Sequence, residues 1–227
     1  MADINGKRIR LAVVDLDGCI LDSMPVWLRL GRDYLRTYGL EAEENLSRRL
    51  APMSLAEGAA YLHRRYLPER SPETIQEDLV LRIRDFYAND APLKEGAERL
   101  LRLLKAAAIP IYLLSATPEA QIRAALRRLA VRRFFDRIYS SHELKRSKSD
   151  PLLYQELARQ AGEAPACCWV LEDSVHAIRA AKKAGFRSLA IYDEASEENS
   201  MELRAEADVY LENWRDFRIQ MGAGSFI

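Results

Sequence analysis

The 227-residue sequence lacks several features that would by themselves define a class of protein. No apolar run approaches the roughly 20 residues that span a bilayer, and the first ten residues lack the apolar stretch of a secretory signal. We therefore expect a cytoplasmic protein with no membrane partner. The three cysteines, two of them adjacent, offer neither a disulfide framework nor zinc-ligand spacing. Lys plus Arg and Asp plus Glu number 34 each, and this absence of net charge argues against a nucleic-acid partner.

The composition is that of an ordinary globular protein, with 48% hydrophobic and 30% charged residues. The length suits one domain with an insertion, or two small domains. No sustained heptad pattern and no exposed apolar helix stands out, so we expect a monomer.

Short apolar runs alternate with amphipathic stretches over most of the chain. The apolar runs, predicted as strands, are 8–14, 109–114, 137–139, 168–171, 188–192 and 208–211. The amphipathic stretches, predicted as helices, are 95–107, 119–130, 151–161 and 175–184. Strands and helices in alternation form βαβ units, which predicts a doubly wound, Rossmann-like α/β fold with a parallel sheet.

Residues 22–91 break this alternation because they contain only helical patterns. The predicted helices there are 27–38, 55–66 and 74–87. Ser71 fits an N-cap, with Pro72 at the first helical position. We therefore expect an α/β core domain formed by residues 1–21 and 92–227, and a helical cap domain inserted between them.

Two carboxylates follow the first predicted strand, in Asp15-Leu16-Asp17-Gly18. At a spacing of two along extended chain they point to the same side, at the edge where α/β sheets bind ligands. Held together, they repel each other unless a cation or a shared proton compensates. Gly18 lets the backbone approach a ligand closely. A solvated acidic turn would have the same residues, so that interpretation stays open.

The next predicted strand ends at Ser115, followed by Ala116, Thr117 and Pro118. We expect Thr117 to be the N-cap and Pro118 the first residue of the following helix. A hydroxyl beside the amides of a helix start suits a phosphate group. Helix capping alone would also account for these residues.

A later strand ends in Glu172-Asp173, whose hard oxygens suit Mg²⁺ bridged to a phosphate. The same acids would also complement the dipole of the next helix, with Asp173 or Ser174 as its cap. A lysine before a helix, either Lys145 or Lys148, can add positive charge to this edge of the sheet. Spacing alone does not choose between the two lysines.

Taken in order, these segments resemble the motifs of the haloacid dehalogenase-like hydrolases. Asp15 to Gly18 is similar to the first motif, and Ser115, Lys148 and Glu172-Asp173 to the next three. The run DGCILDS from Asp17 is similar to the longer first motif of the phosphatase and β-phosphoglucomutase-like branch.

Two further features support this resemblance to that branch. Its lysine, proline and tyrosine pattern is matched by Lys148, Pro151 and Tyr154, which favours Lys148 over Lys145. The helical insertion also stands where the branch has its small cap. Cys19 departs from the pattern, because the family usually has Thr or Val there.

The resemblance implies a Mg²⁺-dependent phosphatase that acts on a small phosphorylated metabolite through an aspartyl-phosphate. Asp15 would be the nucleophile and Asp17 the general acid and base. The metal ligands would be Asp15, Asp173 and the Asp17 backbone carbonyl, with Glu172 acting beside them. Phosphate would be bound by Gly18, Ser115, Ala116 and Lys148.

Individual residues argue against several alternative activities. Mutases of this branch have a cap arginine after a serine in a short loop, and Leu55 stands there in this chain, which favours hydrolysis. Dehalogenases lack a carboxylate at the position of Asp17, and phosphonate-cleaving relatives need a cap lysine, absent between residues 22 and 90. A Walker-type phosphate loop is absent. A catalytically silent phosphate-binding or regulatory protein remains an alternative.

The substrate itself is not predicted by the sequence. Residues of the insertion that can face it are Trp27, Arg48, Arg49, Met53, Ser54 and Arg64.

Overall fold

The computed structural model describes residues 2–50, 53–221 and 225–226. The chain forms two compact units. The core unit consists of Met1–Asp22 and Ala91–Ile227, and the helical unit is Ser23–Asp90.

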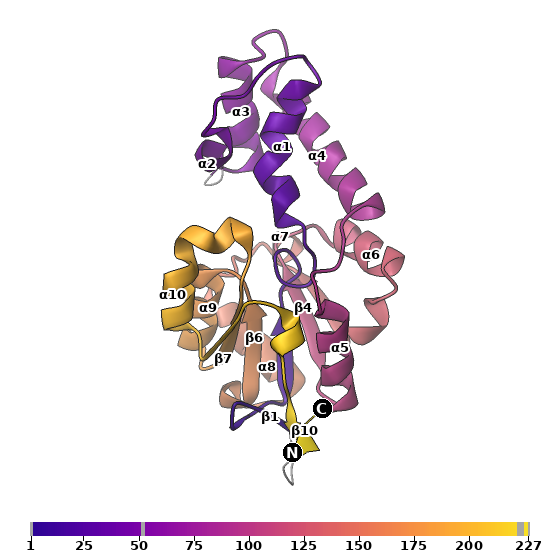
Figure 1. Cartoon of the computed structure of the whole chain (residues 1–227), viewed down its shortest axis with the longest axis vertical. Coiled ribbons are helices and arrows are strands. Elements are labelled where there is room, and N and C mark those ends of the chain that lie inside the picture. The colour runs from indigo at the N-terminus through magenta and orange to yellow at the C-terminus, as the bar shows by residue number, and fades with distance from the viewer. Residues whose placement is uncertain (1, 51–52, 222–224, 227) are drawn as a thin grey trace. The chain divides into compact units, whose positions relative to one another are not determined.

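The centre of the core unit is a six-stranded parallel sheet in the order β5-β4-β3-β6-β7-β8 (Figure 1). Its strands are β3 (Leu11–Val14), β4 (Ile111–Ser115), β5 (Arg137–Ser140), β6 (Cys168–Glu172), β7 (Arg187–Ile191) and β8 (Val209–Leu211). Each corresponds to one of the predicted apolar runs. The predicted doubly wound α/β fold is therefore confirmed.

A second, smaller sheet was not predicted. It pairs a hairpin at the start of the chain with the residues near its end, in the order β10-β9-β1-β2. Its strands are β1 (Ala2–Ile4), β2 (Lys7–Arg8), β9 (Gln220–Met221) and β10 (Ser225–Phe226). Because β2 and the turn after it take the residues before Leu11, the first strand of the large sheet is shorter than predicted.

Helices alternate with the strands of the core unit. They are α5 (Ala97–Ala106), α6 (Glu119–Arg128), α7 (Ser141–Leu144), α8 (Pro151–Ala161), α9 (Val175–Lys183) and α10 (Ser200–Glu206). Short 3₁₀ turns are η1 (Arg132–Phe134), η2 (Pro165–Cys167), η3 (Glu194–Asn199) and η4 (Trp214–Asp216). Every residue of β3, β4 and β6 is buried, as expected of a parallel sheet covered on both faces. On one face, Leu11 and Val170 pack with Leu157 of α8 and Ala181 of α9.

The strand order places a ligand-binding edge beside β3. From β3 the chain adds β4 and β5 on one side, and then returns to add β6, β7 and β8 on the other. Ligands bind outside the carboxyl ends of the strands where the order reverses in this way. Val14 is level with Leu113 of β4 and Leu171 of β6, so the residues just after these three positions meet at that edge.

The helical unit contains α1 (Met24–Arg36), α2 (Leu46–Leu50), α3 (Leu55–Arg65) and α4 (Pro72–Asn89). The three predicted helices are present, and the short α2 is additional. Ser71 caps α4 as predicted, because its Oγ accepts a hydrogen bond of 3.2 Å from Thr74 N and Pro72 is the first helical residue. No helix among the described residues is long and apolar enough to cross a membrane.

The two segments of the core unit that adjoin the helical unit run side by side. Asp22 N donates to Pro92 O at 3.0 Å, and Lys94 N donates to Ile20 O at 2.9 Å. Gly96 follows, with a φ of +79°. A Cβ there would lie 2.8 Å from Arg215 N, so only glycine fits. This short ladder fixes the return of the chain to the first-motif loop.

Candidate active site

Asp15 is held rigidly at the end of β3. It is buried, and its backbone N–H donates to Leu171 O at 3.0 Å, which extends the pairing of β3 with β6. Gly18 then turns the chain with a φ of +73°, and its N–H donates to Leu21 O at 2.9 Å. The loop therefore presents Asp15 and Asp17 from a fixed backbone.

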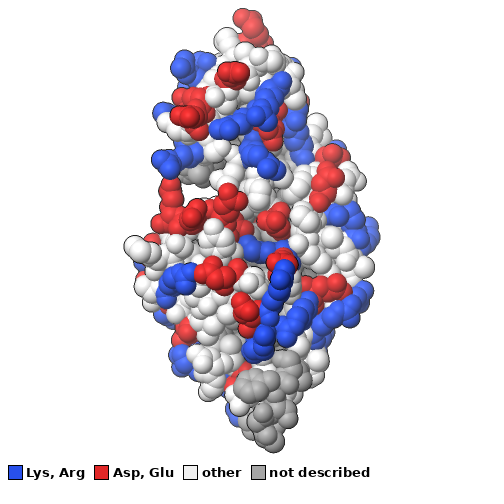
Figure 2. All heavy atoms as spheres, viewed as in Figure 1, with Lys and Arg blue, Asp and Glu red and all other residues white. Residues whose placement is uncertain are grey.

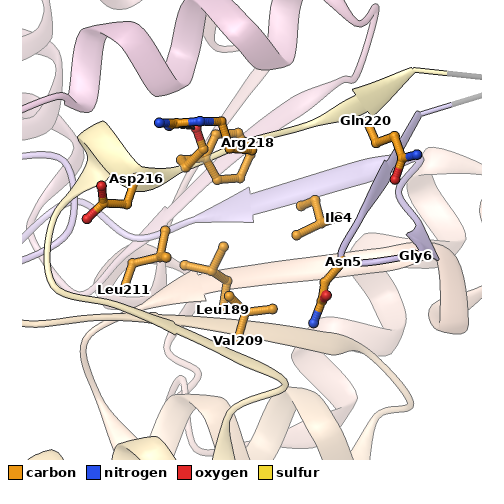
Figure 3. A pocket seen from close by; sticks show the side chains of 10 residues that line it. Ile4, Asn5, Gly6, Leu189, Val209, Leu211, Asp216, Arg218 and Gln220 are labelled. Carbon is orange, nitrogen blue, oxygen red and sulfur yellow. Dashed lines mark hydrogen bonds between the residues drawn. The ribbon is translucent and has the colours of Figure 1, made fainter. Parts of the chain in front are cut away.

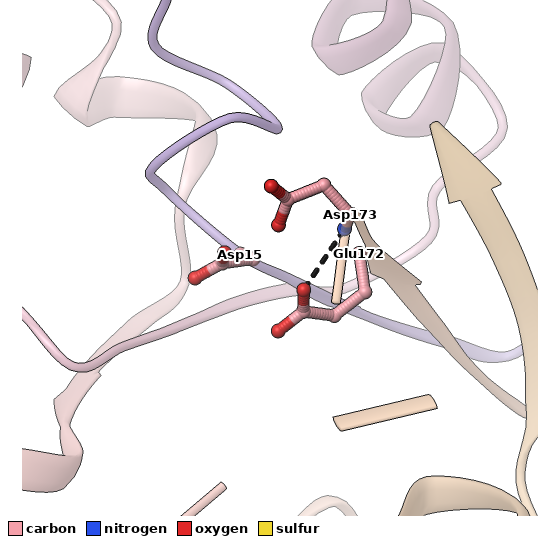
Figure 4. A group of neighbouring side chains, drawn as sticks. All are labelled: Asp15, Glu172 and Asp173. Atoms are coloured by element: carbon pink, nitrogen blue, oxygen red, sulfur yellow. Dashed lines mark hydrogen bonds between the residues drawn. The ribbon is translucent and has the colours of Figure 1, made fainter. Parts of the chain in front are cut away.

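Asp15 is part of a compact acidic cluster with Glu172 and Asp173 (Figure 4). All three are buried, and one oxygen of each lies within 4.8 Å of the others. Glu172 Oε2 accepts the N–H groups of Asp173 and Ser174, both at 2.9 Å. Ser174 is the N-cap residue of α9 but makes no capping hydrogen bond with its side chain. Glu172 thus fixes the backbone that leads into α9, and the Asp173 carboxylate remains directed at the cluster.

Lys148 is the cation that faces this cluster. Its Nζ lies 2.8 Å from Asp15 Oδ1 and also binds Glu172 Oε1. Tyr154 OH fixes the lysine backbone by donating to Lys148 O at 3.0 Å. The competing Lys145 is exposed, at the C-terminal end of α7 in a left-handed conformation. The structure therefore brings Lys148 to the acids.

The charges in this cluster are unbalanced. Burial and the Glu172 carboxylate raise the pKa of Asp15, and burial with the Glu172 charge raises the pKa of Asp173. Burial opposes the charge of Lys148, but Asp15 and Glu172 outweigh it and raise the pKa of the lysine. One ammonium thus faces three buried carboxylates. Hard oxygen donors that lack positive charge fit a divalent cation such as Mg²⁺.

Asp17 has a separate set of partners. Its Oδ2 accepts hydrogen bonds from Thr117 Oγ1 at 2.7 Å and Ser115 Oγ at 3.3 Å. Ser115 Oγ in turn accepts Thr117 N at 3.0 Å. The Asp17 charge adds to the rise in the pKa of Asp15, so both groups belong to one site.

The prediction that Thr117 caps α6 is wrong. The helix begins at Glu119 with Pro118 as its N-cap residue, because the Thr117 hydroxyl donates to Asp17 instead. Sequence reasoning missed Thr117 as a site residue. Its hydroxyl two residues after Ser115, at the end of a buried strand, was the available signal.

The other predicted site residues lie on the same loops. Ala116 is exposed between Ser115 and Thr117. The Gly18 carbonyl accepts a hydrogen bond of 2.8 Å from Lys94 Nζ.

Cys19, which departs from the family pattern, is buried and its Sγ donates to Leu171 O at 3.4 Å. Burial and the nearby Asp15 raise the pKa of this thiol, which disfavours a reactive thiolate.

Three further residues at this edge were missed. Lys94 Nζ also binds Asp193 Oδ2 at 2.6 Å, and Ser196 Oγ donates to Asp173 Oδ2 at 3.4 Å. No local pattern marks these residues, because their partners are 23 to 99 positions away in the sequence.

The candidate substrate residues of the helical unit mostly have partners within that unit. Trp27 Nε1 donates to Tyr87 OH at 3.2 Å, and Arg49 pairs with Glu43 at 3.0 Å. Ser54 caps α3 together with Glu57. Arg64 is exposed, and Ala51 and Pro52 of the predicted loop lie outside the described residues. In Figure 2, basic and acidic side chains of this unit are interspersed on the visible face.

A separate pocket of about 320 Å³ lies in the core unit (Figure 3). It is bounded by the β1–β2 turn at Asn5, by Leu189 and Val209 of the large sheet, and by Asp216 and Arg218. None of the residues that line it belongs to the acidic cluster or to the Asp17 contacts.

Residues 9–185 match the sequence model of the haloacid dehalogenase-like hydrolases, which covers well over half of the chain. The chain belongs to this family. The prediction of an enzyme of this hydrolase family is therefore confirmed.

Curated relatives of this hydrolase include phosphatases of phosphorylated sugars and sugar alcohols. Hexitol phosphatase B of Escherichia coli is 28% identical over 82% of this chain and 84% of its own length. A phosphorylated carbohydrates phosphatase of Thermotoga maritima is 25% identical over 78% of this chain and 82% of its own length.

Solved structures share the fold of this hydrolase. A Thermotoga maritima protein assigned as a beta-phosphoglucomutase has a TM-score of 0.80 and 23% identity, covering 91% of this chain and 96% of that one. CbbY of Rhodobacter sphaeroides, solved with phosphate, has a TM-score of 0.72 and 22% identity, covering 92% and 96%. At these identities the likeness concerns the fold alone.

Proposed function

We propose that this hydrolase is a Mg²⁺-dependent phosphatase of small phosphorylated metabolites, with phosphorylated carbohydrates as the first class of substrate to test. The observation that supports it best is the separation of the two aspartates. Asp15 lies with Lys148 among buried acids, whereas Asp17 two residues later is bound by the hydroxyls of Ser115 and Thr117. A nucleophile and an acid–base group need such different surroundings. The carbohydrate substrates named for two relatives support the substrate class.

The reaction has two steps. In the first, an oxygen of Asp15 attacks phosphorus, the bond to the leaving oxygen breaks, and Asp17 donates a proton to that oxygen. In the second, Asp17 takes a proton from water, the water oxygen attacks phosphorus, and the bond to Asp15 breaks to release phosphate. Acid–base work of this kind contributes about 10² to 10⁴ in rate. The hydroxyls of Ser115 and Thr117 hold Asp17 in place for both transfers.

Charge on the transferring oxygens is balanced by several groups. Lys148, Ser115 and the backbone amide of Ala116 contact the phosphoryl oxygens, and Gly18, whose own N–H donates to Leu21 O, shapes the loop that lies beside them. Asp15, Asp173 and the backbone carbonyl of Asp17 would hold Mg²⁺, with Glu172 beside them, and the bound ion would supply positive charge to the phosphoryl group. The excess of buried carboxylates supports this choice of metal.

The inserted residues 22–91 act as a cap domain that selects the substrate, as lids do in many enzymes. Hydrolysis is favoured over mutase chemistry because Leu55, at the position of the mutase arginine, begins α3 inside the Ser54–Glu57 capping box. The protein acts as a cytoplasmic monomer.

The test is hydrolysis of p-nitrophenyl phosphate by the purified protein, with Mg²⁺ and with EDTA, and with Asp15→Asn as the variant. We expect turnover that needs Mg²⁺ and is absent from the variant. A panel of hexitol and sugar phosphates then ranks substrates. Conversion of β-glucose 1-phosphate to glucose 6-phosphate would instead establish a mutase. Absence of turnover on every phosphate, with Mg²⁺ still bound, would favour a silent binding protein.

A further inference from the structure

Lys94 is an almost buried cation outside the predicted site. It lies four residues past the end of the helical unit, where the chain returns to the core unit. Its side chain is 14% exposed, and its partner Asp193 is 3% exposed. Lys94 Nζ donates to Asp193 Oδ2 at 2.6 Å and to the Gly18 carbonyl at 2.8 Å. The lysine therefore joins the loop after β7 to the loop that carries Asp15 and Asp17.

The connection continues from Asp193 to the acidic cluster. Asp193 Oδ1 accepts Ala195 N at 2.9 Å, which caps η3 at its first turn. The next residue, Ser196, donates from Oγ to Asp173 Oδ2 at 3.4 Å. Hydrogen bonds and one capped turn thus link Gly18, Lys94, Asp193 and Ser196 to the carboxylate of Asp173.

Both ends of this connection are next to proposed metal ligands. At one end is Asp173 itself, and at the other is the Gly18 carbonyl, one residue after the Asp17 carbonyl that is the proposed backbone ligand. We propose that Lys94 is a positioning residue that sets the Mg²⁺ affinity of the site by fixing these two ligands through Gly18 and through Asp193 and Ser196. The inference rests on the proposed function, because it takes the acidic cluster to be a Mg²⁺ site.

The core unit offers a second lysine–aspartate pair as a control, more exposed than the first. Lys7 Nζ lies 2.7 Å from Asp208 Oδ1, and Asp208 also binds Ser188 N at 2.9 Å. Lys7 belongs to β2, whereas Ser188 and Asp208 lie at the amino ends of β7 and β8, and none of the three contacts a residue of the acidic cluster. If the Lys94–Asp193 pair served only the stability of the fold, loss of Lys94 would change Mg²⁺ affinity no more than loss of Lys7 does.

The experiment is a calorimetric titration of the metal-free protein with MgCl₂, in the absence of any phosphate. Groups that orient metal ligands typically change metal affinity by about 10- to 100-fold. We expect Lys94→Met to weaken Mg²⁺ binding about tenfold and Ser196→Ala by about threefold, whereas Lys7→Met leaves it unchanged. Thermal melting of each metal-free variant checks that it is folded.

Equal Mg²⁺ affinity of folded Lys94→Met and the wild type would overturn the inference and leave the proposed function standing. If Lys94→Met does not fold, Ser196→Ala decides in its place, since Ser196 is half-buried and its loss creates no buried charge. A wild-type protein that binds no Mg²⁺ would overturn the proposed function, and the inference with it. Asp173→Asn, which removes a proposed ligand, separates these cases by abolishing binding only where the metal site exists.

Discussion

The two ends of the parallel sheet treat carboxylates in opposite ways. At the carboxyl ends of β3 and β6, three buried acids crowd around Lys148 and the pKa values of Asp15 and Asp173 are raised. At the amino ends, Asp136 and Asp208 are each bound by a lysine and a backbone N–H, and Asp208 also by Arg187 and the Ser188 hydroxyl. Burial alone would raise their pKa values, but these partners lower both. One end of the sheet is therefore arranged for stability, and the other holds charge that the fold itself does not balance.

The largest expected effect follows removal of Lys148, the cation that contacts the acids of the crowded end. Lys148→Met leaves Asp15 and Glu172 without their shared partner. Loss of one member of a buried ion pair lowers the free energy of unfolding by about 3–5 kcal/mol. Turnover falls by about 10²–10³ because a group that balances charge in the transition state is lost. Urea unfolding in EDTA at pH 8 and initial rates with Mg²⁺ measure the two effects.

The opposite substitution changes the sign of the stability effect. Asp15→Asn removes one of the mutually repelling charges, so we expect the metal-free protein to gain about 1–2 kcal/mol while activity is lost. The same urea experiment in EDTA measures the gain. A loss of stability in this variant would show that the Lys148 contact outweighs the repulsion.

The two ends also predict opposite pH dependences for the metal-free protein. Burial and the Glu172 charge raise the pKa of Asp15 from 3.8 to about 8, so between these values the folded state binds more protons than the unfolded state, and stability falls as the pH rises to about 8. The lowered pKa values of Asp136 and Asp208 contribute stability above pH 3.8 that is lost as the pH falls through the folded values.

Melting temperatures in EDTA between pH 3 and pH 8 would separate these contributions. In Asp15→Asn the melting temperature should fall less as the pH rises towards 8. In Asp208→Asn it should fall less as the pH drops towards 3. Added Mg²⁺ should remove most of the decrease in melting temperature towards pH 8, because the ion supplies the positive charge that the cluster lacks. A melting temperature that rises steadily to pH 8 in EDTA would contradict the repulsion at the crowded end.

The sequence predicts the fold and the acidic residues of the site from short-range patterns. Apolar runs that end in acids place Asp15 and Glu172 at the same edge once the sheet is parallel, and periodicity is enough for that step. The Thr117 contact with Asp17 was misread because a hydroxyl before Pro118 fits a helix cap equally well. The hairpin of β1 and β2 was missed although its Asn5-Gly6 turn is a local signal. The pairing of β1 with β9 and the Lys94–Asp193 pair were missed because they join residues far apart in the chain. Tertiary pairing of this kind leaves no local period.

The smallest effect is expected at the amino ends of the sheet. Asp208→Asn keeps an acceptor for Ser188 N but loses the charge that pairs with Lys7 and Arg187, whose side chains are 39% and 41% exposed. A partly solvated ion pair contributes about 1 kcal/mol, so unfolding in urea should shift by about that amount at pH 7. Activity with Mg²⁺ should remain that of the wild type, since no proposed site residue is touched. A clear loss of turnover would mean that the two ends of the sheet are coupled, and the contrast between them would then describe one network instead of two.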